Sequence, residues 1–403
     1  VLTDQSFLND VNKDEFFDYL DYLDYENKKH KYYDSRKKSI KSKSISIRKT
    51  AIKIDLRIFE KQHKLREEFK NGGIPSTVNI VDLNNYSLHE EIGEGTFAEV
   101  FRIINKENEH EQFAAKIFKT EFDDFEISDQ INFSREMAIL SNLNHKAIAK
   151  FVGYSNVDFE GDERPVVIFE IEPNKSLRNI LDLEQRGFGH PDWNDTKKFI
   201  NIFGIACAMR YMHFSNLIHR DLNPNNVLLD EYLYPKLTDF GFSRTNISFN
   251  KIREVCSQLG GTPIYISPEI FNSNLYSSFG DVYAYGMIVY EIITGENPAR
   301  GFHSFWDICY EVSCKKYRPK FTCAIPECYK QLIEDCWSEK PDSRPPFVEI
   351  VNRLLLDKEF TENIDKNEFL DYMDSLNDKF PANNALTLEN SIRILSFQKK
   401  AIS

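Results

Sequence analysis

The stretch His219-Arg220-Asp221-Leu222-Asn223-Pro224-Asn225-Asn226 is followed directly by the apolar run Val227-Leu228-Leu229. An Asp and an Asn at this spacing, on a short loop before a strand, can serve two purposes at one phosphate: the carboxylate orients a hydroxyl nucleophile, and the amide oxygen helps to hold a divalent cation. Chance often supplies a His-Arg-Asp tripeptide, so the assignment depends on partner groups elsewhere in the chain.

Upstream of this loop, one segment has the composition of a phosphate-binding turn. It reads Ile92-Gly93-Glu94-Gly95-Thr96-Phe97-Ala98-Glu99-Val100-Phe101 and predicts a strand, a glycine turn and a second strand. Gly93 and Gly95 let backbone amides approach phosphates closely, and Phe97 at the tip can cover them. A dinucleotide-binding fold would need a helix directly after the glycines, and the alternating apolar residues found there exclude it.

The next predicted strand carries a cation that requires an anionic partner. The run Phe113-Ala114-Ala115-Lys116-Ile117-Phe118 places an ammonium among apolar residues, which is costly unless an anion receives it. Glu136 shares one face of a predicted helix with Leu140 and Leu143, so its carboxylate points the same way as core residues. We therefore expect Glu136 to pair with Lys116.

These segments resemble the catalytic domain of eukaryotic protein kinases, and the resemblance covers roughly residues 86 to 356. The sequence matches, in order, the family's glycine loop, V-A-I-K, H-R-D-L-x-x-x-N, D-F-G at Asp239-Phe240-Gly241, and C-W-x-x-x-P-x-x-R-P-x-F at 336–347. The resemblance implies an α+β, two-lobed protein kinase fold. Its small lobe would hold a five-stranded antiparallel sheet plus one helix, and its large lobe would be mainly α-helical.

The resemblance also implies a role for each motif residue. Asp221 would be the catalytic base, and Lys116, supported by Glu136, would contact the α- and β-phosphates of ATP. Asn226 and Asp239 would hold Mg²⁺. The nucleotide would lie against the glycine loop, the adjoining strands and the backbone of the hinge, at Ile92, Gly93, Glu94, Gly95, Thr96, Phe97, Ala98, Val100, Ala114, Lys116, Glu170, Glu172 and Leu228.

The stretch from residue 239 to residue 269 would be the activation segment. An arginine beside a catalytic carboxylate normally requires a second anion, and Arg220 holds that position. A phosphate on Ser248 or Ser257, added by an upstream kinase or by autophosphorylation, would supply the anion.

Two further motifs bear on the acceptor and on the subgroup. Gly261-Thr262-Pro263-Ile264-Tyr265 resembles the substrate-docking wall of Ser/Thr kinases, whereas the ending at 336–347 is typical of tyrosine kinases and their Ser/Thr relatives. The mixture indicates the tyrosine-kinase-like group. Within it, Arg344 is expected to pair with Glu269.

The main departure from the family pattern lies two residues after Asp221. Ser/Thr kinases usually carry a lysine there, in contact with the γ-phosphate, and this chain has Asn223; Asn225 likewise replaces an arginine of tyrosine kinases. Losing a charge-assisted contact to a transferring phosphate costs on the order of 2–4 kcal/mol of transition-state stabilisation. The sequence therefore predicts a slow enzyme unless another cation substitutes.

The composition is that of a globular protein, with 403 residues of which 41% are hydrophobic and 28% charged. The net charge of −12 argues against a nucleic-acid partner. Seven cysteines without a CxxC pair indicate reduced thiols, and we therefore expect a cytoplasmic protein. The sequence shows no signal peptide pattern and no uncharged apolar run of 18 residues, so we expect no signal peptide and no transmembrane segment. The chain begins with Val1 and not with Met, which leaves open whether it is a fragment.

The sequence predicts three regions. Residues 1–84 form an N-terminal extension with a basic, Ser-rich linker; residues 85–357 form the kinase domain, with a small lobe at about 85–170 and a large lobe at about 174–357; and residues 358–403 form a C-terminal tail. The basic stretch at 28–53 is interpreted as a solvated linker, or alternatively as an electrostatic tether that phosphorylation would switch off.

An acidic amphipathic pattern occurs twice. Asn12-Lys13-Asp14-Glu15-Phe16-Phe17-Asp18-Tyr19-Leu20-Asp21 resembles Asp365-Lys366-Asn367-Glu368-Phe369-Leu370-Asp371-Tyr372-Met373-Asp374 in register. Either a short interaction helix is duplicated, or residue 1 lies in the tail of a preceding, related unit; coincidence is the third interpretation. The tail is interpreted as a solvated appendage, with docking or autoinhibition as alternatives.

Three functions follow from these patterns. The first is an ATP-dependent protein kinase that transfers the γ-phosphate of Mg-ATP to Ser/Thr hydroxyls of protein substrates, with tyrosine as a further acceptor. The second is a weakly active or inactive kinase-like scaffold that binds nucleotide. The third is an interaction protein that works through its basic arm and acidic helices.

Overall fold

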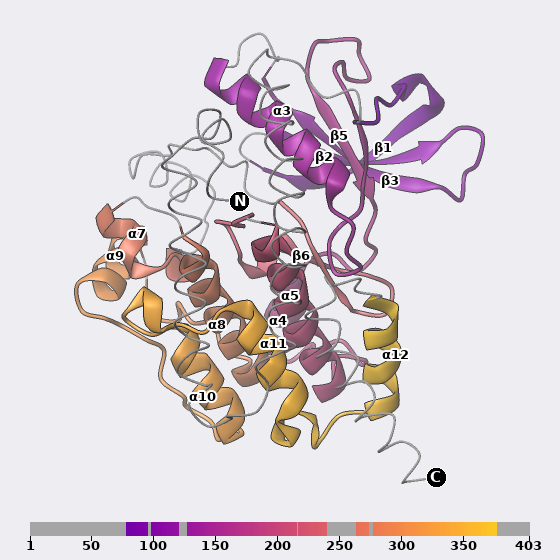
Figure 1. Cartoon of the computed structure of the whole chain (residues 1–403). Coiled ribbons are helices and arrows are strands. Elements are labelled where there is room, and N and C mark those ends of the chain that lie inside the picture. Colours follow the sequence, from indigo (N-terminus) through magenta and orange to yellow (C-terminus); the bar gives the residue numbers. More distant parts are fainter. Residues whose placement is uncertain are drawn as a thin grey trace, which may run out of the picture.

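The computed structural model describes residues 78–95, 98–120, 127–215, 217–239, 263–273, 277–302 and 304–376. The expectations for the N-terminal extension up to residue 77, for Thr96 and Phe97, for activation-segment residues 240–262 and for the tail after residue 376 lie outside the described residues. Within them the chain forms two lobes, a small sheet-containing lobe and a larger helical lobe (Figure 1). No helix among the described residues is long and apolar enough to cross a membrane.

The small lobe contains the expected five-stranded antiparallel sheet, with strand order β1-β2-β3-β5-β4. Its strands are β1 (Tyr86–Glu94), β2 (Ala98–Asn105), β3 (Gln112–Phe118), β4 (Phe151–Ser155) and β5 (Val166–Glu170). Successive side chains of a strand point to opposite faces. In β3, Ala115 is fully buried in a small core with Ile103 and Ile168, so Ala114 and Lys116 project from the opposite face.

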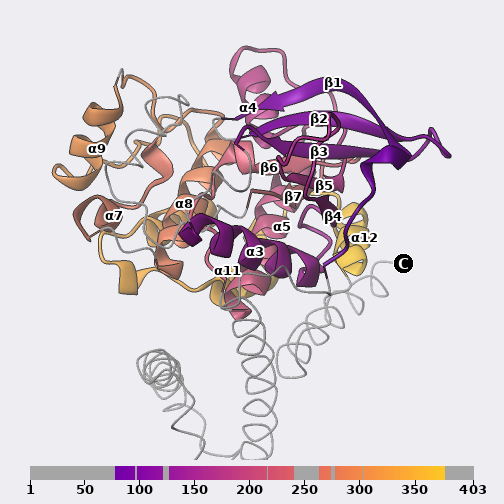
Figure 2. The same cartoon turned by 90° about the horizontal axis from the view of Figure 1, so that it is seen from above.

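The expected helix is α3 (Ile127–Asn142), which lies along the sheet (Figures 1 and 2). Phe133, Met137 and Leu140 recur at helical spacing and are buried, and the ring of Phe133 packs edge-on against Phe118 at 5.6 Å. Glu136 lies beside these residues and is itself buried. The helix thus carries one carboxylate into an otherwise apolar interface.

The chain before β1 covers the free edge of the sheet. Ile80 forms a parallel bridge with Tyr154 of β4, and the Val81 amide donates to the Tyr154 carbonyl at 2.8 Å. A Cβ atom at Gly153 would lie 2.6 Å from the Val81 side chain, so only glycine allows this approach. Exposed sheet edges tend to pair with other chains, and this segment prevents such pairing at β4.

The large lobe is mainly helical, as expected, and its two central helices are α5 (Asp195–Phe214) and α8 (Ser278–Thr294). Almost every residue of α8 from Gly280 to Ile292 is buried, and the helix ends at Gly295, whose φ of +68° favours glycine. The remaining elements surround these two helices: α4 (Leu177–Gln185), β6 (Val227–Leu229), β7 (Pro235–Leu237), α7 (Pro268–Ser273), α9 (Phe305–Ser313), α10 (Glu327–Cys336), α11 (Phe347–Leu356) and α12 (Lys366–Leu376).

The last described helix, α12, differs from the solvated appendage that we expected. It packs along α5 (Figure 1), and four of its apolar side chains are buried in the main core: Phe369, Tyr372, Met373 and Leu376. The amphipathic pattern correctly predicts a helix here. A single sequence does not reveal which surface its apolar face covers, because that surface is built from residues far away in the chain.

We predict that Gly204→Ala in α5 destabilises the protein, although alanine is normally about 1 kcal/mol better than glycine inside a helix. A Cβ atom at residue 204 would lie 2.2 Å from the Tyr372 hydroxyl and 2.6 Å from the Pro235 ring. Such overpacking costs about 1–3 kcal/mol, which should reverse the sign of the substitution. Urea denaturation of wild type and variant measures the difference.

Tyr372→Phe provides the matched background for this measurement, because it removes the nearest of the two clashing groups. Gly204→Ala should cost less in that background than in wild type. A stabilising effect of Gly204→Ala in wild type would show that α12 does not press on α5 at this position.

Candidate active site

The loop from His219 to Asn226 is held by a single buried carboxylate in the first turn of α8. Asp281 Oδ2 accepts the His219 amide at 2.9 Å, and Oδ1 accepts the Arg220 amide at 2.9 Å. His213 of α5 lies 2.7 Å from Oδ2 through its Nε2 atom. Arg220 has a φ of +70°, a conformation that non-glycine residues adopt only where surrounding contacts enforce it. The two hydrogen bonds that the backbone amides of His219 and Arg220 donate to Asp281 enforce this conformation.

Two amide side chains fix both carboxylate oxygens of Asp221. Asn223 Nδ2 donates to Oδ1 at 3.0 Å, and Asn226 Nδ2 donates to Oδ2 at 2.8 Å; both also donate to the Asp221 carbonyl. Asn223 Oδ1 in turn accepts the Asn225 amide and caps the 3-10 turn Pro224–Asn226. The Asn223 amide is therefore turned toward Asp221.

The carboxylate of Asp221 has an altered proton affinity. Asp221 as a whole residue is exposed, but the protein atoms around its carboxylate reduce the hydration of that group. This desolvation raises the pKa of Asp221 to about 6. The hydrogen bonds from Asn226 and Asn223 oppose the rise in pKa, and the nearby Asp239 charge adds to it. A carboxyl group in this range is poised to accept a proton near neutral pH.

Lys116 contacts a carboxylate that we did not expect as its partner. Its ammonium donates to Asp239 Oδ1, and the charge of Glu136, the expected partner, also acts on it. Burial works against the charge of Lys116, but Asp239, Glu136 and Asp221 together outweigh it and raise the pKa of Lys116. Burial also raises the pKa of Glu136 to about 8, and its Oε2 accepts no hydrogen bond from the described residues. The spacing of residues in the sequence does not show which of the three carboxylates lies nearest to Lys116. It therefore did not predict the contact of Lys116 with Asp239.

Asn226 and Asp239, the expected metal ligands, are joined through the backbone at the start and the end of one hairpin. The strands β6 and β7 pair between them, and the Thr238 amide donates to the Asn226 carbonyl at 3.0 Å. Because Asn226 uses its Nδ2 atom on Asp221, its amide oxygen remains for a cation. Mg²⁺ prefers such oxygen donors and commonly takes its other ligands from phosphates and water. Accordingly, the described residues contain no cluster of three or more His, Cys, Asp or Glu that would hold a metal alone.

The residues expected to surround the nucleotide line one side of the junction between the lobes. Val100 lies opposite Lys116 in the β2–β3 pair, and Ala114 lies opposite Phe169 in the β3–β5 pair. Val100, Ala114 and, on β6, Leu228 are all only half-buried. Half-buried apolar side chains from both lobes can hold a flat ring between them.

The glycine turn and the hinge complete this boundary. The Gly95 amide donates to the Ala98 carbonyl at 2.8 Å, between β1 and β2. Gly93 and Glu94 are the last residues of β1 and pair with Val100 and Glu99 of β2, and Ile92 of β1 is exposed. Glu170 ends β5, and Glu172 follows in the connection to α4. Burial raises the pKa of the Glu172 side chain to about 7. The Phe169 ring packs edge-on against Phe151 at 6.1 Å.

The expected ion pair between Glu269 and Arg344 is confirmed. Arg344 is fully buried and donates to both Glu269 oxygens, at 2.7 and 2.9 Å. Burial favours the neutral carboxyl, but the bonds from Arg344 outweigh it and hold the pKa of Glu269 below its ordinary value. The pair ties α7 to the loop before α11.

Sequence reasoning missed a second buried ion pair near this platform. Arg178 of α4 forms a two-pronged contact with Glu291 of α8 at 2.6 Å for each oxygen, and the Tyr265 hydroxyl donates to Glu291 at 2.6 Å. Nothing in the local sequence distinguishes Arg178 from a solvent-facing helix residue. Glu291, inside an apolar run, is the only signal that a partner was required.

Comparison with known proteins shows the family of this chain. Residues 86–354 match the family described as protein tyrosine and serine/threonine kinase. A Dictyostelium discoideum protein described as "Probable serine/threonine-protein kinase drkC" is 30% identical over 318 residues, which are 78% of this chain and 40% of that protein. Two dual specificity protein kinases of the same organism are also similar. The kinase splA is 29% identical over 294 residues (68% of this chain, 12% of splA), and pyk3 is 28% identical over 274 residues (68% and 19%). The chain thus spans less than half the length of each of these relatives.

Proposed function

The chain belongs to the family of protein tyrosine and serine/threonine kinases, and from this premise we propose that it transfers the γ-phosphoryl group of ATP to serine and threonine hydroxyls of protein substrates. The observation that carries the proposal is the convergence of Lys116 with the carboxylates of Asp239, Glu136 and Asp221. One ammonium set among three carboxyl groups suits a polyphosphate with its counter-ion.

We assign the chemical step to Asp221. The hydroxyl oxygen of the substrate forms a bond to the γ-phosphorus, the bond from that phosphorus to the β-bridging oxygen breaks, and ADP leaves. The hydroxyl proton passes to the Asp221 carboxylate, which Asn223 and Asn226 hold in place. Asn226 and Asp239 would bind Mg²⁺, which supplies charge neutralisation at the phosphates when bound.

Serine and threonine are the favoured acceptors for two reasons. The drkC relative is described as a serine/threonine kinase, and the splA and pyk3 relatives as dual specificity kinases. In this chain, Pro263–Tyr265 forms a buried 3-10 turn whose Tyr265 is bonded to Arg178 and Glu291. The turn resembles the docking wall of Ser/Thr kinases, and these bonds give it a fixed position from which to select an acceptor.

Asp221→Asn should lower kcat at least about 100-fold, because the amide cannot accept the hydroxyl proton. Radiolabelled phosphate transfer from ATP to a generic protein substrate measures kcat, and phosphoamino-acid analysis of the product identifies the acceptor. Lys116→Met should weaken ATP binding as well. Asp371→Asn on the exposed side of α12 is the matched control and should leave transfer unchanged.

The same assay separates the alternatives. Transfer that is insensitive to Asp221→Asn would remove the assignment of the chemical step to this site. ATP binding by the wild-type chain without any transfer would identify a nucleotide-binding scaffold instead of an enzyme.

The raised pKa of Asp221 predicts how kcat/KM depends on pH. Below about pH 6 the carboxyl is protonated and cannot accept a proton, so kcat/KM should fall on the acid side and level off above that value. Asn223→Ala removes a hydrogen bond that lowers the pKa, and its acid limb should therefore move to higher pH. Asn225→Ala, which alters an exposed side chain, is the control. Nucleotide ionisation contributes equally to all three profiles, so coinciding limbs would contradict this role of Asn223.

Asn223→Lys should raise kcat on the order of 10-fold, because an ammonium near the transferring phosphate replaces an amide that is occupied with Asp221. Initial rates at saturating ATP measure the change. Asn223→Met, of similar length without charge, is the comparison variant. If both variants lower kcat to the same extent, the amide contact with Asp221 matters more than the missing charge.

A further inference from the structure

The groove that holds α12 is lined by aromatic side chains of α5 and of the hairpin beyond it. Phe369 of α12 packs edge-on against Phe199 at 4.9 Å and Phe203 at 5.1 Å. Tyr372 lies 4.8 Å from the ring of Tyr234, which begins the approach to β7. The apolar face of α12 thus covers a surface that would otherwise be open to solvent.

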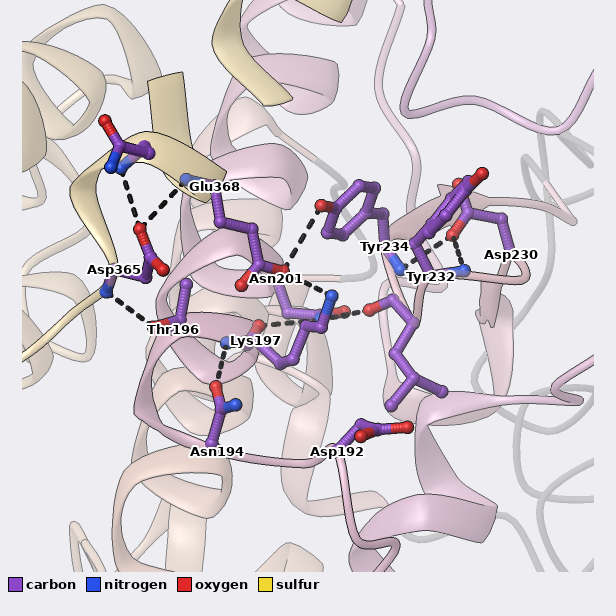
Figure 3. A network of polar contacts seen from close by, with 12 residues as sticks. Asp192, Asn194, Thr196, Lys197, Asn201, Asp230, Tyr232, Tyr234, Asp365 and Glu368 are labelled. Carbon is purple, nitrogen blue, oxygen red and sulfur yellow. Dashed lines mark hydrogen bonds and ion pairs between the residues drawn. The ribbon is translucent and has the colours of Figure 1, made fainter. Parts of the chain in front are cut away.

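Polar contacts fix the register of α12 in this groove (Figure 3). Lys197 of α5 forms an ion pair with Glu368, and the Tyr234 hydroxyl donates to the same Glu368 oxygen at 3.3 Å. The Asp365 amide donates to Thr196 Oγ1 at 2.8 Å, and Asp365 Oδ1 accepts the amides of Asn367 and Glu368. The first turn of α12 is therefore docked by charge and by a cap as well as by apolar contact.

Residues 12–23 repeat every one of these contact groups at the same spacing. The apolar face of Phe369, Tyr372, Met373 and Leu376 corresponds to Phe16, Tyr19, Leu20 and Leu23, and the docking groups Asp365 and Glu368 correspond to Asn12 and Glu15. Asparagine is as good a helix cap as aspartate. The match extends over the whole helix length, so it is a match of docking chemistry and not only of amphipathic character.

We propose that residues 12–23 are a second docking helix for the α5 groove, which they occupy in exchange with α12. The position of α12 in the structure and its short connection to α11 give it the advantage in the intact chain. Residues 12–23 are tethered by a longer stretch, the 54 residues from 24 to 77; a random coil of that length would have an r.m.s. reach of roughly 40 Å. Such a tether gives residues 12–23 an effective concentration at the groove that is higher than the concentration of a competitor present at micromolar levels. The exchange therefore occurs within one chain. When residues 12–23 hold the groove, α12 and the chain after it are released.

Thermal unfolding of the full chain tests the exchange through non-additivity. Phe16→Ala/Tyr19→Ala alone should lower Tm by less than about 1 °C, because α12 holds the groove. In a Phe369→Ala/Tyr372→Ala background, where α12 is weakened, the same pair should lower Tm by about 3 °C or more. Asp18→Ala/Asp21→Ala is the matched control, because the corresponding Asp371 and Asp374 are exposed, and it should have no effect in either background. Equal small effects of Phe16→Ala/Tyr19→Ala in both backgrounds would overturn the proposal.

A photo-crosslinking experiment gives the location without depending on stability. Benzoylphenylalanine replaces Phe16 in the full chain, and mass spectrometry identifies the captured peptide. Capture of α5 around Phe199 and Phe203 should rise several-fold when Phe369→Ala/Tyr372→Ala is present, in the monomer band. Capture in the dimer band would instead show exchange between copies and would overturn the intrachain proposal. Absence of capture on α5 in both proteins would show that residues 12–23 serve another surface.

Discussion

The carboxylate of Asp281 is the constraint on which the site depends. It lies buried at the start of α8, the most deeply buried helix of the large lobe, and it accepts two consecutive backbone amides of the loop before Asp221. Because those amides would otherwise be buried without acceptors, the loop can take its strained turn at Arg220 only in this position. The placement of Asp221 and Asn226 follows from that turn.

A second constraint is electrostatic. The Lys116 ammonium donates to Asp239, and the charges of Glu136 and Asp221 act on it as well. Glu136 and Asp221 both have raised pKa values, so each binds a proton more readily than an ordinary carboxyl group. The described residues thus gather more carboxyl groups than one lysine pairs with, and a bound Mg²⁺ would balance the charge of those that are ionised.

Asn223 and α12 show how a family fold can be modified without being lost. At position 223, where a lysine would place a positive charge near the phosphate, this chain has an asparagine whose amide donates to Asp221. The Asp221 carboxylate is thereby held in position, but the positive charge is lost. At α12, a helix beyond the matched family region becomes part of the core by covering α5. In both places the sequence draws attention to the residues, but the consequence arises from what lies next to them in space.

The sequence by itself determined the strand that carries Lys116, through its apolar run, and its motifs determined the resemblance to protein kinases. That resemblance implied the two-lobed fold and the pairing of Arg344 with Glu269. Only the tertiary structure decided that Lys116 bonds Asp239 ahead of Glu136, that the Asn223 amide faces Asp221, that Arg178 meets Glu291 inside the large lobe, and that α12 is buried on α5. Each of these depends on distances between groups that are far apart in the chain, and such distances are set by packing and not by the order of the residues.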